Sequence, residues 1–182
     1  ADAKFTGLFS DLNSSEPENG KIYSGMVKEV NGEKIGIFGL TTEETKDIAF
    51  VGSVKFENYI EEAKKAVKAF EGMGVNKIIA LTHIGFDDNP TIDNDQQLAK
   101  HVDGIDVIVG GHTHSQLGEP FIVKTNAVGE AKETTIIVQA NEYGKYLGTL
   151  DVQFDKKGIV TTYKGELLEI AKSAKSLYSS ES

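Results

Sequence analysis

The chain has 182 residues, of which 39% are hydrophobic, and this is enough for one packed core in a single domain or in one large piece of a domain. Nineteen Lys and Arg against twenty-eight Asp and Glu give a net charge of -9, which disfavours binding to a nucleic acid duplex or an anionic membrane. The absence of cysteine excludes disulfides, a thiolate nucleophile and Cys-ligated zinc, and no run of about 18 apolar residues predicts a membrane span.

Alternating strands and helices are predicted up to about residue 110. Within the first thirty residues, a polar segment at 14–20 predicts a loop flanked by short apolar pieces. Compact apolar runs indicate strands, and apolar residues at spacings of three and four indicate helices. In chain order we expect a strand over 32–40, a helix over 56–73, a strand over 77–81, a helix over 94–102 and a strand over 105–109. This order is typical of βαβ units with parallel strands and right-handed crossovers.

After residue 115 the sequence changes to an alternation of apolar and polar residues. The alternation is clear at 134–138 and 150–154, and a polar turn at 155–158 precedes a further strand over 159–163. These segments predict antiparallel strands and a hairpin that complete the sheet system. The last twelve residues, 171–182, are rich in Ser and Lys and are expected to form a polar tail or linker.

Three histidines follow the ends of predicted parallel strands. His83 comes just after the strand over 77–81, and His112 and His114 come just after the strand over 105–109. The carboxyl ends of parallel strands meet at one edge of an open α/β sheet, where ligands bind, so the three histidines can converge there. Neutral imidazole is a common ligand of zinc and similar ions, and the placement therefore favours a metal or phosphate site.

Local geometry strengthens the case for two of these histidines. His112 and His114 are two residues apart, so in an extended stretch both rings project to the same side and Thr113 points away. The alternative is that each histidine is only a capping or core residue, which is the usual role of a lone histidine. His101, on the predicted helix over 94–102, is interpreted as a solvated surface residue.

Other polar residues near these strand ends permit two interpretations. Asp87, Asp88, Asp93 and Asp95 could extend a cation site through oxygen ligands, but a solvated loop with a helix N-cap at Asp93 or Asn94 is favoured. A second group could line the same pocket or form a simple turn. This group consists of Asn141, Tyr143 and Gly144.

The segment Gly-Gly-His-Thr-His at 110–114, preceded by Gly-Ile-Asp-Val-Ile, is highly specific, and further matching segments lie at 34–43, 79–85, 138–140 and 143–148. Together they resemble the 5'-nucleotidase branch of the calcineurin-like metallophosphoesterases. The resemblance implies an α/β fold, a partial four-layer α/β/β/α sandwich with parallel βαβ units followed by antiparallel strands. On this basis residues 1–170 are expected to be the C-terminal part of the catalytic domain.

The resemblance also implies a metal centre and a substrate class. His83 and His112 correspond to ligands of one metal ion and His114 to a ligand of a second, in a complete domain that binds two Zn, Mn or Fe ions and hydrolyses nucleotide phosphomonoesters. The motifs Asp-x-His, Gly-Asp and Gly-Asn-His of the family are absent, and the first thirty residues resemble the stretch that follows them. We therefore expect no catalytic residue in this chain, no metal or one weakly held ion, and no activity in isolation. Substrate-binding residues remain unassigned.

Two further expectations follow from the resemblance. The family suggests an extracellular or cell-wall-associated bacterial protein, and the surface left by the missing half of the sandwich is expected to promote self-association. The alternative function is a non-catalytic binding or scaffold module that keeps the fold without the N-terminal metal motifs.

Overall fold

The computed structural model describes residues 24–87, 89, 91 and 94–170. The loop predicted over 14–20 and the tail predicted over 171–182 lie outside these residues. None of the helices in the described part of the chain is long and apolar enough to cross a membrane.

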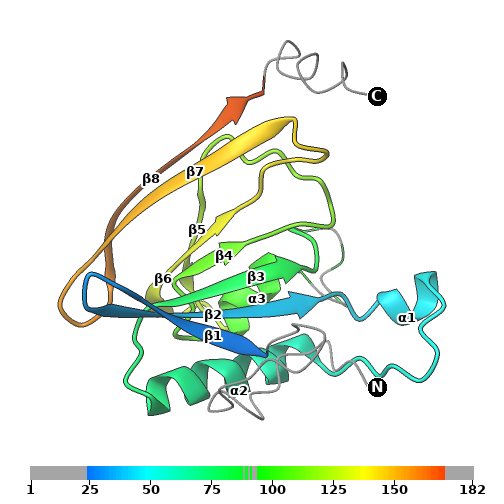
Figure 1. The fold of residues 1–182 in the computed structure, drawn as a ribbon, viewed down its shortest axis with the longest axis horizontal. Coiled ribbons are helices and arrows are strands. Elements are labelled where there is room, and N and C mark those ends of the chain that lie inside the picture. Colours follow the sequence, from blue (N-terminus) through cyan, green and yellow to red (C-terminus); the bar gives the residue numbers. More distant parts are fainter. Residues whose placement is uncertain (1–23, 88, 90, 92–93, 171–182) are drawn as a thin grey trace, which may run out of the picture.

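Six strands form the main sheet, in the order β1-β2-β3-β4-β6-β5 (Figure 1). The four central strands β2, β3, β4 and β6 are parallel, and β1 and β5 are antiparallel to their neighbours at the two edges. Their bounds are Gly25–Val30 for β1, Glu33–Thr41 for β2, Ile78–His83 for β3, Val107–Val109 for β4, Phe121–Thr125 for β5 and Ala131–Val138 for β6.

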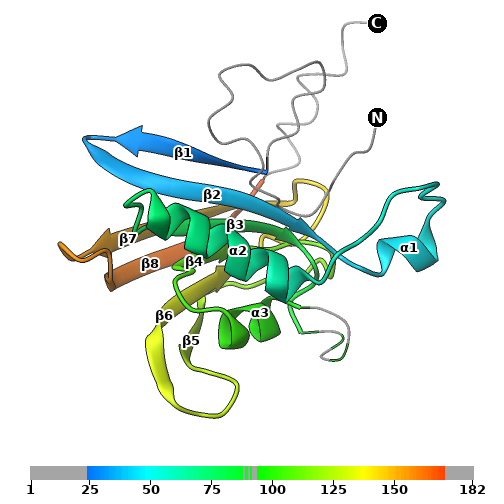
Figure 2. The same cartoon turned by 90° about the horizontal axis from the view of Figure 1, so that it is seen from below.

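Two helices, α2 (Tyr59–Gly72) and α3 (Asp95–His101), cover one face of this sheet, and Figure 2 shows them next to each other. Each begins at an asparagine whose side chain accepts a hydrogen bond from the first turn, which is a favoured way to start a helix. Phe70 of α2 is fully buried and packs so closely on β2 that a Cβ at Gly36 would lie 2.7 Å from its ring. A short helix, α1 (Thr45–Ile48), follows β2 and buries no residue.

The hairpin of β7 (Tyr146–Phe154) and β8 (Val160–Glu169) forms a second, two-stranded sheet. It packs on the face of the large sheet opposite the helices. Ile108 and Ile137 are buried in the core on the helix side, so the neighbouring Val109 and Val138 point to the other side. These two valines and the hairpin line a cavity of about 190 Å³. At the other end of the hairpin, the Asn76 side chain donates a hydrogen bond to the Lys157 carbonyl at 2.9 Å. The described residues therefore form a helix layer, a six-stranded sheet and a two-stranded sheet.

The α/β fold class is confirmed, as are the predicted strands and helices between residues 32 and 109. The hairpin predicted from strands at 150–154 and 159–163 is also present, with longer strands, as β7 and β8. Two features differ from expectation. Residues 25–30, for which no element was predicted, form a strand, and β6 pairs not only antiparallel with β5 but also parallel with β4.

Candidate functional site

The carboxyl ends of the parallel strands bring together segments that are far apart in the sequence. His83 is the last residue of β3, the loop 110–115 follows β4, and the loop 141–145 follows β6. The segment after β2 reaches the same edge, because the Thr42 amide donates a hydrogen bond to the His83 carbonyl at 3.0 Å. The predicted clustering of histidine-bearing loops at one sheet edge is therefore present.

His83 and His112 lie in direct contact, with ring centroids 5.1 Å apart in an edge-to-face arrangement. Gly111 permits this approach, since a Cβ there would lie only 3.1 Å from His83 Nδ1. Desolvation lowers the pKa of His83, and the nearby His112 and His114 lower it further. A lowered pKa keeps the imidazole neutral, which is the form that binds metal ions.

The backbone around His112 and His114 is not extended, so the geometric argument based on an extended stretch was wrong. His112 has a φ of 77° and His114 a φ of 56°, both in the left-handed region that residues other than glycine rarely adopt. Thr113, between them, turns inward and accepts a hydrogen bond from the Phe86 amide at 3.1 Å. The loop is thus bent at both histidines, a conformation that the spacing of two could not reveal.

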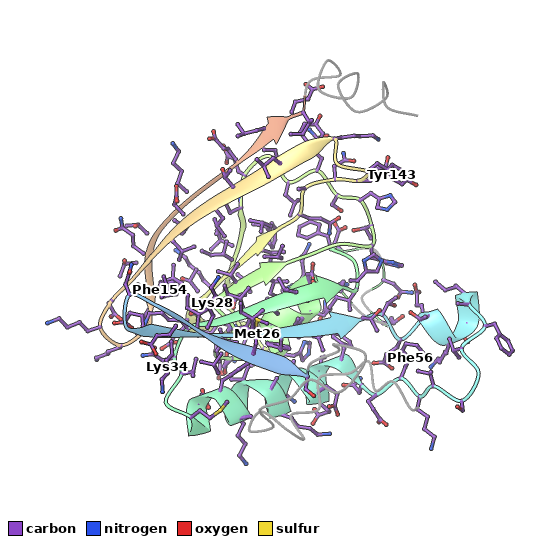
Figure 3. All side chains as sticks on the ribbon, viewed as in Figure 1. Met26, Lys28, Lys34, Phe56, Tyr143 and Phe154 are labelled. Carbon is purple, nitrogen blue, oxygen red and sulfur yellow. The ribbon has the colours of Figure 1, made fainter. Side chains whose placement is uncertain are left out.

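His114 faces the loop that follows β6. Its Nδ1 lies 2.8 Å from Glu142 Oε2, and the other oxygen of Glu142 accepts a hydrogen bond from Lys145 Nζ at 2.5 Å. The ring of Tyr143 lies 5.9 Å from that of His114, and Figure 3 shows Tyr143 at the outer end of this loop. The hydrogen bond and the charge of Lys145 lower the pKa of Glu142. The residues Asn141, Tyr143 and Gly144 therefore border the histidine edge.

The acidic stretch has a structural role where it is described. The sequence predicted a helix N-cap at Asp93 or Asn94, and Asn94 is the N-cap of α3. Its side chain accepts a hydrogen bond from the Gln97 amide at 2.8 Å. Asp95 is fully buried and accepts a hydrogen bond from Thr82 Oγ1 at 2.6 Å, so it is not part of a solvated loop. Asp87 is exposed, whereas Asp88 and Asp93 lie outside the described residues.

The histidine edge carries side chains of the kinds that bind metal ions. Two imidazoles in contact, with a third ring nearby and a carboxylate bonded to that third ring, are donors that suit zinc and similar ions. Within residues 24–87, 89, 91 and 94–170, however, no group of three or more His, Cys, Asp or Glu side chains has a metal-binding arrangement. The assignment of His83, His112 and His114 as ligands therefore stays a prediction.

Reasoning from the sequence placed His101 correctly on the surface, where its Nδ1 lies 2.9 Å from the Gln97 carbonyl oxygen within α3. It did not identify two carboxylates at the histidine edge. Glu44 Oε2 lies 3.6 Å from His112 Nε2, and Glu142 contacts His114. The only available signal was their location after strand ends, in the segments that follow β2 and β6.

The fold and the site define an α/β protein with a histidine-rich edge at the carboxyl ends of parallel strands. The trifunctional nucleotide phosphoesterase protein YfkN of Bacillus subtilis is 44% identical over 85% of this chain and 10% of its own length. A snake venom 5'-nucleotidase from Gloydius brevicauda is 38% identical over 81% of the chain and 26% of its own length. The crystal structure of a 5'-nucleotidase precursor from Thermus thermophilus superimposes with a TM-score of 0.72 at 39% identity, covering 82% of this chain and 30% of that one.

By sequence and fold, the chain belongs to the 5'-nucleotidase family. No family model matches it. The chain spans about a tenth to a quarter of the length of these two curated relatives.

Proposed function

We propose that this chain is part of a dinuclear metal-dependent phosphoesterase that hydrolyses nucleotide phosphomonoesters, with residues 1–170 forming the C-terminal part of its catalytic domain and residues 171–182 a tail or linker. The observation that carries the proposal is the contact of His83 with His112 at the carboxyl edge of the sheet. The activities for which the relatives are named, nucleotide phosphoesterase and 5'-nucleotidase, support the substrate class.

In this proposal His83 and His112 bind one metal ion and His114 binds the second. When bound, two divalent ions, Zn, Mn or Fe, would supply positive charge for the oxygens of a phosphoryl group and would lower the pKa of water at the site. Glu142 orients His114 for this role. When His114 Nδ1 carries the proton, it donates a hydrogen bond to Glu142, and His114 Nε2 is then free to bind a metal ion. Gly111 gives the loop close access to His83.

Without the additional ligands that a complete domain supplies, the chain is expected to bind either no metal ion or one ion weakly. Three neutral imidazoles do not compensate the repulsion between two close cations. We therefore propose that the chain alone is inactive. The second candidate is a non-catalytic binding or scaffold module with the same fold. An extracellular or cell-wall location is proposed because one relative is a snake venom protein and another is named as a precursor.

The test is phosphate release from AMP in the presence of Mn²⁺ or Zn²⁺, measured for this chain and for the chain extended by the upstream sequence that its gene encodes. We expect activity only in the extended protein, with loss of activity in His112→Ala. His101→Ala is the matched control, because it removes an exposed histidine outside the site. A folded extended protein that is inactive with both metals would favour the non-catalytic module, and full activity in His112→Ala would refute the assigned ligand role.

A further inference from the structure

The loop that carries His112 and His114 has an unusual backbone. Both residues adopt left-handed φ angles, 77° and 56°, although neither is a glycine. Such conformations persist only where surrounding interactions determine them. Two of them within three residues call for a specific restraint on this loop.

The side chain of Gln139, the first residue after β6, provides contacts along the whole loop. Its Oε1 accepts hydrogen bonds from the Ser115 amide and from Thr113 Oγ1, the latter at 3.3 Å, and its Nε2 donates to the Gly111 carbonyl at 3.1 Å. Gln139 therefore binds positions 111, 113 and 115, on both sides of each histidine. With only 2% of its surface exposed, it is shielded from competition by solvent.

Gln139 is itself held firmly by the sheet. Its carbonyl accepts a hydrogen bond from the Leu117 amide at 3.2 Å, and the neighbouring Val138 carbonyl accepts one from the Gly110 amide at 2.8 Å. The loop is thus tied to the end of β6 at its start and just beyond its end. Thr113 connects it to the segment after β3 through the Phe86 amide.

We propose that Gln139 is a positioning residue, whose carboxamide holds the loop 110–115 in the conformation that presents His112 and His114. Gln139 contacts neither histidine side chain in the hydrogen bonds of the described residues and acts through the backbone and side chain of the intervening positions. The expected consequence for metal binding rests on the proposed function. The effect on the loop itself does not.

The primary variant is Gln139→Met, which keeps a side chain of similar length and removes all three hydrogen bonds. Gln139→Glu, when ionised, keeps acceptors for Ser115 and Thr113 and places an acceptor oxygen where the donor to the Gly111 carbonyl was. Gln153→Met is the matched control, because Gln153 is exposed on β7. Circular dichroism of each variant verifies that it is folded, and Gln139→Glu keeps the test possible if Gln139→Met does not fold.

The first measurement is amide hydrogen exchange of Ser115 in the metal-free chain, by NMR. We expect exchange at least about 10-fold faster in Gln139→Met, near-native exchange in Gln139→Glu, and no change in the control. Unchanged exchange at Ser115 in folded Gln139→Met would overturn the proposal, whether or not the protein is a phosphoesterase. If Gln139→Met does not fold, the Thr113 amide of Gln139→Glu decides, because it donates to the Gly111 carbonyl that loses its Gln139 partner. The proposal requires faster exchange at that amide, and native exchange at Thr113 would overturn it.

The second measurement is the dissociation constant for Zn²⁺, by calorimetry on the extended protein. We expect binding to weaken by about 10- to 100-fold in Gln139→Met, the range seen when groups that orient metal ligands are removed. Native affinity in a variant with faster loop exchange would make Gln139 structural only and would overturn its positioning role. If the unmutated extended protein binds neither Zn²⁺ nor Mn²⁺, the proposed function fails, while the exchange result still decides whether Gln139 holds the loop.

Discussion

A buried carboxyl far from the histidine edge should make the stability of this protein depend on pH. Asp106 is only 8% exposed, and its Oδ2 accepts a hydrogen bond from the Ile78 amide at 2.7 Å. Desolvation raises the pKa of Asp106 from 3.8 to about 7, against the opposing effects of the Ile78 hydrogen bond and of two nearby lysines. The folded state therefore binds the Asp106 proton more tightly than the unfolded state does.

The sign of the pH effect follows from this difference. The stabilisation is fully present below about pH 4, where both states are protonated, and it is lost as the pH rises to about 7. At about 1.4 kcal/mol per pH unit, the whole effect is about 4 kcal/mol. In Asp106→Asn the side chain stays neutral and can accept the same hydrogen bond. At pH 4 we therefore expect the free energy of unfolding of the variant to be close to that of the native protein. At pH 8 we expect the variant to be more stable by up to about 4 kcal/mol.

The measurement is guanidinium chloride unfolding followed by circular dichroism between pH 4 and pH 8, on the native chain and on Asp106→Asn. Asp151→Asn, which replaces an exposed carboxyl on β7, controls for the change in net charge. A difference between native and Asp106→Asn stability that does not grow with pH would refute the reasoning, as would a less stable variant at pH 8.

Two further predictions concern the packing of the sheet edge and the apolar residues that stay exposed on the hairpin side of the sheet. Gly110→Ala should lower the free energy of unfolding by about 1–3 kcal/mol in the same assay, because its Cβ would lie 2.1 Å from Oδ2 of the buried Asp95. A Cβ at Gly118 would meet nothing within 4 Å, so Gly118→Ala should leave the stability unchanged. Equal stability of the two glycine variants would contradict this. Leu81 and its cross-strand neighbour Val109 are 49% and 41% exposed. We therefore expect concentration-dependent self-association in sedimentation velocity. Leu81→Lys should reduce this association, whereas Phe50→Lys, at a fully exposed residue elsewhere in the chain, should not. A native chain that is monomeric at all concentrations would argue against this expectation.

The sequence predicts the buried elements well, because their patterns report burial directly. The helix α2 presents Ala63, Val67 and Phe70 to the core at spacings of three and four, and β2 is a compact apolar run. The edge strand β1 was missed, since most of its residues are exposed and no burial pattern marks it. The available signal was Asn31-Gly32, which has φ values of 53° and 83° and forms the tight turn of a hairpin rather than a simple strand boundary.

The candidate site was predictable in location but not in detail. Strand ends placed His83 and His112 at one sheet edge, and the structure brings their rings into contact. The partners of the histidines depend on backbone turns that no periodicity encodes. Glu142 reaches His114 from a loop after β6, and the left-handed angles of His112 and His114 depend on contacts with a residue more than twenty positions away.

The structure suggests why a buried polar side chain, rather than an apolar one, lies beneath the histidine loop. A left-handed backbone at a residue other than glycine costs about 1–3 kcal/mol, and the loop has two such residues. Three hydrogen bonds from one buried carboxamide, each contributing about 0.5–1.5 kcal/mol, are of the same order and can offset this cost. An apolar residue at position 139 would fill the space but leave the Ser115 amide and the Gly111 carbonyl without this partner, so the loop would relax toward other conformations. The orientation of His112 and His114 is in this sense determined at the end of β6, a strand that carries neither histidine.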